Sequence, residues 1–164
     1  MRVSNKTPYA ELQPYEELLA PESVQELKAA AEAQYRNCYT LTIDEFFGII
    51  NGDYSILGDM SNPSVLQVYW LKRFTDFCEE FAKACNALSI KDPTQEYLHN
   101  GCAEMQPQEA MLIFTREYFG LPSFFEAGKR TLGEYLTARK DKFNEAVMHR
   151  NSEAEQKRKL KQRK

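Results

Sequence analysis

The chain has 164 residues, of which 43% are hydrophobic and 12% aromatic, and its formal net charge is −3. A chain of this length buries roughly two-thirds of its unfolded surface, so it can form one domain without a metal or a disulfide. Its ten phenylalanines and nine tyrosines predict a core rich in rings and exclude an intrinsically disordered chain.

The apolar runs of the sequence are short. Residues 1–9 contain no apolar stretch of the kind found in secretory signals. The densest runs, 46–50 and 110–114, fall far below the roughly 20 residues of a membrane-spanning helix. Without a signal segment, the four cysteines are predicted to be reduced thiols. We therefore expect an intracellular, cytoplasmic protein with no membrane contact.

The charges are unevenly divided along the chain. Residues 1–138 hold 11 lysines and arginines against 20 aspartates and glutamates, whereas residues 139–164 hold 10 against 4. The first part therefore carries a net charge of −9 and the second part a net charge of +6. We divide the chain into a helical domain over 1–150 and a basic tail, or helical extension, over 151–164.

Prolines and capping residues mark where the first helices are expected to begin. Pro21 opens an alanine-rich stretch of high helix propensity that runs to about Arg36. Residues 38–43 could pass for a strand. However, Thr42 and Glu45 have the spacing of a capping box, which favours a short helix over 43–50.

The strongest pattern predicts an amphipathic helix over residues 63–88, with Asn62 as its N-cap and Pro63 in its first turn. Its apolar residues recur at spacings of three and four, and Phe77 widens the stripe that they form: Leu71, Phe74, Cys78, Phe81, Cys85 and Leu88. We expect four of them to be buried, with Trp70 near the edge of the buried face: Leu71, Phe74, Phe81 and Leu88. The charged residues assigned to the solvent-facing side are Lys72, Arg73, Glu79, Glu80 and Lys83.

Three further helices are predicted in the second half. One covers residues 93–100, and another begins at Pro107 and stops at Gly120. The last begins at a capping box over 123–126 and continues to about 147, but glycines at 128 and 133 each weaken it by about 1 kcal/mol, so that it bends or breaks there. Together these elements predict an all-α fold, a single irregular bundle of five to seven helices.

Candidate metal ligands are few. The chain has two histidines, and only His99 has a cysteine close by, Cys102, whereas a structural zinc site needs four ligands. Cys78 and Cys85 lie about 10.5 Å apart along one helix, too far to complete such a site, so we interpret the cysteines as buried small hydrophobes. The loop over 51–62 resembles a calcium loop but has Ile56 where the turn needs glycine and lacks the final glutamate, which favours a turn with Asx capping.

The sequence also lacks the usual catalytic patterns. It has no glycine-rich phosphate loop and no nucleophile elbow, and the adjacent carboxylates Glu16–Glu17 and Glu79–Glu80 diverge by about 100° on a helix. We therefore predict no catalytic residue, no metal and no cofactor. The protein is expected not to be an enzyme.

The basic tail is the feature of the sequence that indicates a binding partner. Its candidate binding residues for nucleic acid or for an acidic protein are Lys157, Arg158, Lys159, Lys161, Arg163 and Lys164. These cations could neutralise several phosphates without sequence preference, but the tail has no aromatic residues on which bases could stack. A tail that only improves solubility is the remaining alternative.

One part of the chain, residues 40–80, resembles small helical proteins encoded by bacteriophages of gut bacteria. The resemblance rests on the segment 41–47, on 51–55, on Asn62-Pro63 and on Val65-Leu66 leading to Trp70. It implies an accessory role in the assembly of a virion or tail, and a location in the host cytoplasm or the virion. We therefore expect a non-catalytic assembly factor, adaptor or small structural component that binds a protein partner or its own copies through helical faces. The alternative is a nucleic-acid-binding accessory protein that uses the basic tail.

Overall fold

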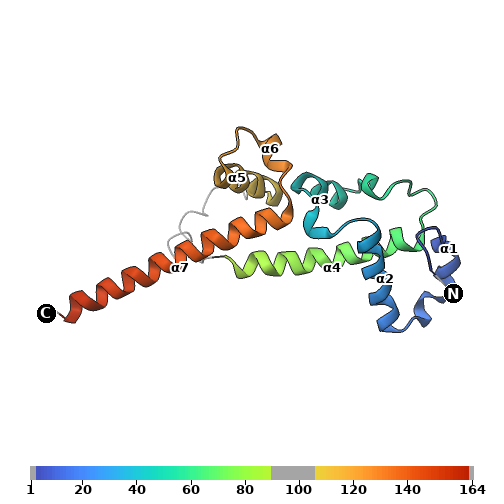
Figure 1. Ribbon diagram of the computed structural model, residues 1–164, viewed down its shortest axis with the longest axis horizontal. Helices are drawn as coiled ribbons and strands as arrows, with labels where there is room; N and C mark the ends of the chain where they lie inside the picture. The colour runs from blue at the N-terminus through green and yellow to red at the C-terminus, as the bar shows by residue number, and fades with distance from the viewer. Residues whose placement is uncertain (1–2, 90–105, 163–164) are drawn as a thin grey trace.

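The computed structural model describes residues 3–89 and 106–162, and the protein is all-α within these ranges (Figure 1). Its α-helices are α1 (Tyr9–Leu12), α2 (Pro21–Gln34), α3 (Ile43–Ile50), α4 (Val65–Ala87), α5 (Pro107–Phe119), α6 (Phe124–Gly128) and α7 (Leu132–Gln162). Three 3-10 segments lie between them: η1 (Gln13–Leu18), η2 (Cys38–Thr40) and η3 (Ser55–Leu57). The predicted all-α bundle of five to seven helices is confirmed. The helix predicted over 93–100 lies outside the described residues.

The short helix α3 begins where the sequence predicts. The Thr42 backbone N–H donates to Glu45 Oε2 at 2.8 Å, and the Glu45 N–H donates to Thr42 Oγ1 at 3.1 Å. The alternative of a strand over 38–43 is wrong because η2 occupies Cys38–Thr40. Only an isolated bridge, from Thr42 to Thr131, pairs this part of the backbone with a distant segment in the described ranges.

Helix α4 forms the axis of the fold, and it begins two residues later than predicted. Ser64, not Asn62, is its N-cap: Ser64 N donates to Gln67 Oε1 at 2.8 Å and Gln67 N donates to Ser64 Oγ at 3.2 Å. The carbonyl of Pro63 accepts a hydrogen bond from the Tyr9 N–H at 2.9 Å, which holds Pro63 outside the helix.

The buried face of α4 is rotated by about one residue from its predicted position. Phe74 and Phe81 are buried as predicted, but Leu71 and Leu88 are only half-buried. Trp70, expected at the edge, is fully buried, because its Nε1–H donates to the Arg36 carbonyl oxygen at 2.8 Å beneath the segment that follows α2.

Helix α3 explains this rotation. Its Phe46 ring packs into the middle of α4, with ring centroids 5.6 Å from Phe74, 6.3 Å from Phe77 and 5.7 Å from Phe81. Phe77 is therefore at the centre of the core and has no exposed surface. Tyr135 of α7 joins the same cluster, with its ring centroid 6.1 Å from Phe81.

Helix α2 crosses the other side of α4 and is held there by ion pairs as well as by packing. Lys28 pairs with Asp76 at 2.7 Å, and Glu32 pairs with Arg73 at 2.9 Å. Arg73, which was predicted to face solvent, is therefore half-buried. Lys72, also predicted to face solvent, is half-buried where it pairs with Glu16 of η1. The other three are exposed as predicted: Glu79, Glu80 and Lys83.

The last predicted helix breaks at its first glycine. A bend or a break there was expected from the sequence. Helix α6 ends at Gly128, which lies against the Asp44 carboxylate of α3. Helix α7 then begins with its own capping box, in which Thr131 N donates to Glu134 Oε2 at 2.8 Å and Glu134 N to Thr131 Oγ1 at 3.1 Å.

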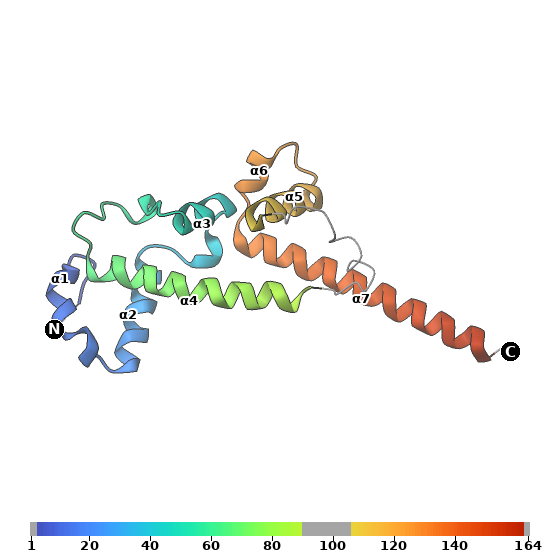
Figure 2. The ribbon, with the colours of Figure 1, turned by 180° about the vertical axis from the view of Figure 1, so that it is seen from behind.

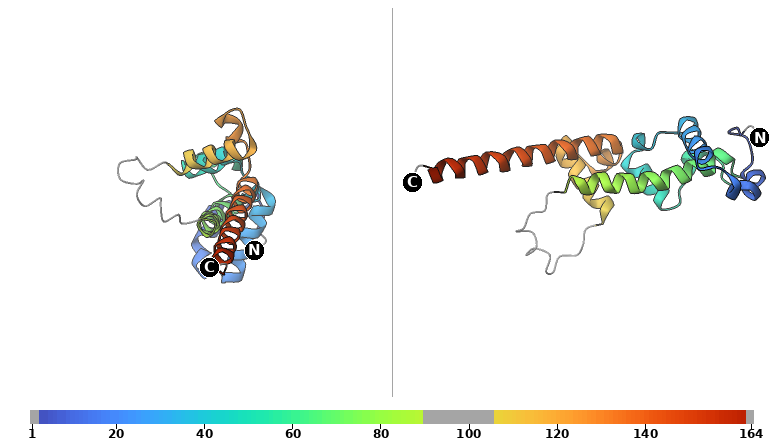
Figure 3. Two further views of the ribbon diagram at one scale, coloured as in Figure 1. Left: turned by 90° about the vertical axis from the view of Figure 1, so that its left-hand side faces the viewer. Right: turned by 90° about the horizontal axis from the view of Figure 1, so that it is seen from below.

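The molecule is elongated, and its two ends differ. Helices α1 and α2 lie at one end, and the last turns of α7 extend from the other (Figure 2). The right-hand view in Figure 3, seen from below, shows the same separation. No helix in the described ranges is both long and apolar enough to cross a membrane.

Candidate interaction surface

Helix α7 is the longest element of the fold, and only its first part is packed. Its last buried residue is Ala138, and its last half-buried one is Ala146. Every residue from 147 to 162 is exposed. We call residues 147–162 the α7 arm, which spans roughly 24 Å at 1.5 Å of rise per residue.

Local interactions contribute to the helical structure of the α7 arm. Its sequence contains no glycine or proline. Ion pairs at helical spacing join Lys159 to Glu155 at 2.8 Å and His149, when protonated, to Glu153 at 3.4 Å. Lys159 and Lys161 also place positive charge in the last turn, where it stabilises the helix dipole.

Four of the six residues predicted to bind a partner lie on this arm. Lys157, Arg158, Lys159 and Lys161 are all exposed, while Arg163 and Lys164 lie outside the described residues. Lys157 and Lys161 are one helical turn apart on the same face, but Lys159 lies near the opposite face. The cations therefore surround the helix and do not form a single patch.

One face of the α7 arm was not recognised from the sequence. Val147, Arg150, Ala154, Lys157 and Lys161 follow one another at spacings of three and four, so they share a face, which we call the arm stripe. Spacings of three and four, continued backward along α7, reach the half-buried Phe143 and Arg139 and then the buried Leu136 and Leu132. The face of α7 that packs against α4 and α5 near the start of the helix is therefore exposed in the arm.

A second polar cluster lies at the other end of the molecule, where η1 meets α4. The Glu16 carboxylate accepts hydrogen bonds from the hydroxyls of Tyr9 and Tyr69, the latter at 3.1 Å, and pairs with the Lys72 ammonium. Burial raises the pKa of the Tyr69 hydroxyl and lowers the pKa of Lys72. These groups line a depression of about 450 Å³. Because they satisfy one another, we interpret the cluster as the attachment of η1 to α4.

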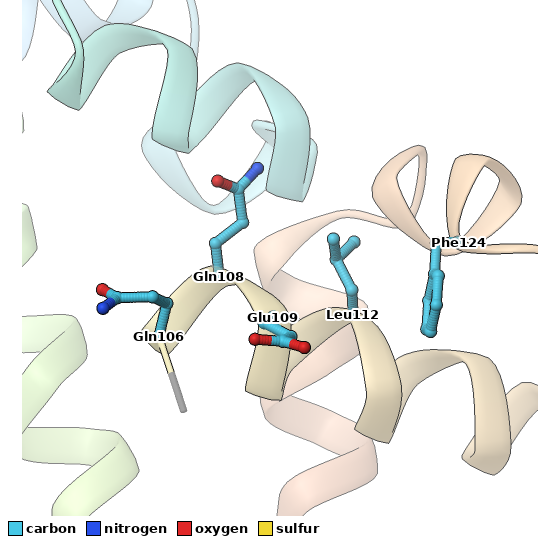
Figure 4. Close-up of a pocket in the computed structure, with 5 residues that line it drawn as sticks. All are labelled: Gln106, Gln108, Glu109, Leu112 and Phe124. Atoms are coloured by element: carbon cyan, nitrogen blue, oxygen red, sulfur yellow. The ribbon is translucent and has the colours of Figure 1, made fainter. Parts of the chain in front are cut away.

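A further depression, of about 330 Å³, lies between the first turn of α5 and Phe124 of α6 (Figure 4). Figure 4 shows the side chains of Gln106 and Gln108 diverging from one another, with Glu109 and Leu112 between them and Phe124. Ligand sites combine an apolar wall with polar groups that converge. The polar groups of this depression do not converge, so it is a weaker candidate than the arm.

The residues considered for metal binding have local roles in the structure. In the loop after α3, Asp53 Oδ1 accepts from Ser55 N at 3.1 Å and Asp59 Oδ1 accepts from Ser61 N at 2.9 Å. These hydrogen bonds are the predicted Asx caps. The side chain and backbone of Ser55 lower the pKa of Asp53, and the backbone and side chain of Ser61 lower the pKa of Asp59. The described residues contain no group of three or more side chains suited to a metal ion. His99 and Cys102 lie outside those residues.

The described cysteines are free thiols within the core or at its edge. Cys38 is fully buried, and burial raises the pKa of its thiol to about 12. Burial also raises the pKa of Cys78 and of Cys85, which are half-buried. A protonated thiol is a poor nucleophile and a poor metal ligand, so these three cysteines behave as the small hydrophobes that the sequence predicts.

Comparison of the chain with protein-family models, with curated proteins and with solved structures gives no match.

Proposed function

We propose that the protein is a non-catalytic assembly factor or adaptor that binds another protein through the α7 arm. The observation that carries this proposal is the exposure of every residue of the arm on a helix that continues a packed one. Most of the stability of a helix in a protein comes from packing one of its faces. A helix that extends into solvent with every residue exposed therefore gains its packing partner from outside the fold.

The charge of the arm indicates the kind of surface that it binds. The arm holds five lysines and arginines against two glutamates. A basic helix of this kind is complementary to an acidic groove or helix face, and complementary charge favours both the rate and the specificity of association. The partner is accordingly an acidic protein surface. A role in building a phage virion or tail rests on the resemblance over residues 40–80 and stays a prediction.

Sequence-independent nucleic-acid binding is the second candidate, because four cations lie within residues 157–161 of an exposed helix. Three features weigh against it. Lys159 lies away from the Lys157–Lys161 face and pairs with Glu155 at 2.8 Å. The arm has no aromatic residue for stacking, and residues 1–138, with a net charge of −9, repel a phosphate backbone.

Crosslinking from the arm in living cells tests the proposal. A photoreactive amino acid replaces Ala154, which is exposed in the middle of the arm stripe, and a matched control carries it at the exposed Glu79 of α4. We expect position 154 to give one dominant protein adduct that position 79 does not give. Adducts with nucleic acid alone, or no adduct above the level at position 79, would contradict the proposal.

A further inference from the structure

Helix α2 has an outer face that is exposed in the described structure. Ala31 is fully buried against α4, and the opposite side of α2 is exposed. Four exposed residues follow one another there at spacings of four, three and four: Glu22, Glu26, Ala29 and Ala33. We call these four residues the α2 outer face. One half of this face is acidic, and the other half is small and apolar.

The negative charge of the α2 outer face is not compensated locally. Lys28 and Glu32, on the sides of the helix, pair with Asp76 and Arg73 of α4. In contrast, Glu22 and Glu26 form no ion pair with any residue in the described ranges. Two carboxylates one helical turn apart repel each other, so a partner that brings positive charge to both would be favoured.

The arm stripe has the same spacing as the α2 outer face when it is read in the opposite direction along the chain, and its charges have the opposite sign. Read backward from its basic end, Lys161, Lys157, Ala154 and Arg150 are spaced by four, three and four, as Glu22, Glu26, Ala29 and Ala33 are when read forward. If the two helices pack side by side in opposite directions, each residue of one series meets a residue of the other. The two pairs of opposite charge are Lys161 with Glu22 and Lys157 with Glu26.

The small residues in the same register allow the two helices to approach closely. Ala154 meets Ala29, and Arg150 meets Ala33, where the long arginine side chain can extend over the alanine methyl groups. Helix axes pack 8–10 Å apart, with alanines permitting the shorter distances. The arm and α2 are also of similar length, roughly 24 Å and 21 Å at 1.5 Å per residue.

The arm cannot reach the α2 outer face of its own chain. In Figures 1 and 3, α2 lies at one end of the elongated molecule and the arm extends from the other end, pointing away from it. An α2 outer face that the arm could bind would therefore belong to a second copy of the chain.

We propose that the α7 arm of one copy docks antiparallel onto the α2 outer face of a second copy. This inference rests on the proposed function, since it names the acidic partner as another molecule of the same protein. Each copy offers one arm and one outer face. Two copies can therefore exchange arms in a closed dimer, or successive copies can continue in a chain, as heterologous contacts do.

Charge reversal on each side, and then on both sides, tests the contact. One variant carries Lys157→Glu and Lys161→Glu, a second carries Glu22→Lys and Glu26→Lys, and a third combines all four substitutions. Sedimentation velocity over a concentration series at low salt measures association. We expect the full chain to self-associate, each double variant to associate about tenfold or more weakly, and the fourfold variant to recover association because both charges are exchanged.

A matched control separates this contact from a general effect of net charge. The pair Glu109→Lys and Glu117→Lys makes the same charge change at exposed positions of α5, outside both surfaces, and should leave association unchanged. A full chain that stays monomeric at low salt, or a fourfold variant that fails to recover, would overturn the inference. The proposed function would fail separately, since crosslinking from position 154 to a different acidic protein would uphold it while excluding a second copy as the partner.

Discussion

The two parts of α7 lie on one continuous helix but in opposite environments. In the first two turns, Leu132 and Tyr135 are buried against the ring cluster around α4. In the arm, Met148 and Leu160 are 72% and 65% exposed. The backbone helix is continuous through both parts, but the first part packs against neighbouring elements and the arm does not. Substitutions in the rest of the fold, which we call the body, should therefore change folding, and substitutions in the arm should change binding.

The largest expected effect lies in the ring cluster. Phe81 is 5% exposed, and its ring lies 5.6 to 6.1 Å from those of Phe77, Phe46 and Tyr135. Replacing Phe81 by alanine leaves a cavity among these rings and should lower the free energy of unfolding by about 3–5 kcal/mol. Urea denaturation followed by circular dichroism measures it. Leu160→Ala in the arm is the matched control and should change stability by less than about 0.5 kcal/mol. Equal losses of stability in the two variants would contradict the difference between the core and the arm.

The next effect concerns the hydrogen bond that buries Trp70. A Trp70→Phe variant keeps a ring to stack on Phe74, whose centroid lies 5.6 Å away, but removes the donor to the Arg36 carbonyl oxygen. An unsatisfied buried carbonyl costs about 1–3 kcal/mol, so unfolding should become easier by that amount. The same denaturation experiment checks it. No loss of stability would mean that water satisfies the carbonyl.

Smaller effects are expected at the helix caps of the body. Thr42 and Thr131 each accept a backbone hydrogen bond at a helix start, and either one replaced by alanine should cost about 1 kcal/mol. Thr137→Ala serves as the control, because this exposed threonine only bonds back to the Gly133 carbonyl within α7. Thermal unfolding should show lower midpoints for the two cap variants and not for Thr137→Ala.

The same caps predict how stability depends on pH. The Thr131 backbone N–H lowers the pKa of Glu134. Burial opposes ionisation of Glu45, but the hydrogen bonds from Thr42 and the pairing with Arg36 outweigh it and lower the pKa of this carboxyl too. A carboxyl with a lowered folded pKa stabilises the fold above its unfolded pKa of about 4.3, and this contribution is lost as pH falls through the folded value. Glu45→Gln with Glu134→Gln should therefore flatten the loss of stability below about pH 4.3; an unchanged slope would contradict this assignment.

The sequence predicted best what depends on neighbours in the chain. The capping box of Thr42 and Glu45 spans three residues, so the start of α3 follows from local spacing alone. The break after Gly128 was expected from helix propensity, although the Asp44 carboxylate that lies against this glycine comes from a distant part of the chain. The all-α class follows from the same local signals.

What depends on distant contacts could not be predicted. The burial of Trp70 requires a carbonyl 34 positions earlier in the chain, and the rotation of the α4 stripe requires Phe46 of α3. The candidate surface divides in the same way. The charge imbalance pointed to the basic tail, but the sequence did not show which face of α2 stays uncovered, because the position of α4 decides it.

The central claim is that the α7 arm serves binding and not folding, and the stability of a chain ending at residue 146 tests it most directly. Urea unfolding of the full chain and of this truncated chain, followed by the same circular dichroism signal, gives the two free energies of unfolding. Since residues 147–162 are all exposed, we predict that the two values agree within about 0.5 kcal/mol when both chains are measured at a concentration at which the full chain is monomeric. A truncated chain that is less stable by about 2 kcal/mol or more would show that the arm belongs to the fold, and would contradict the account.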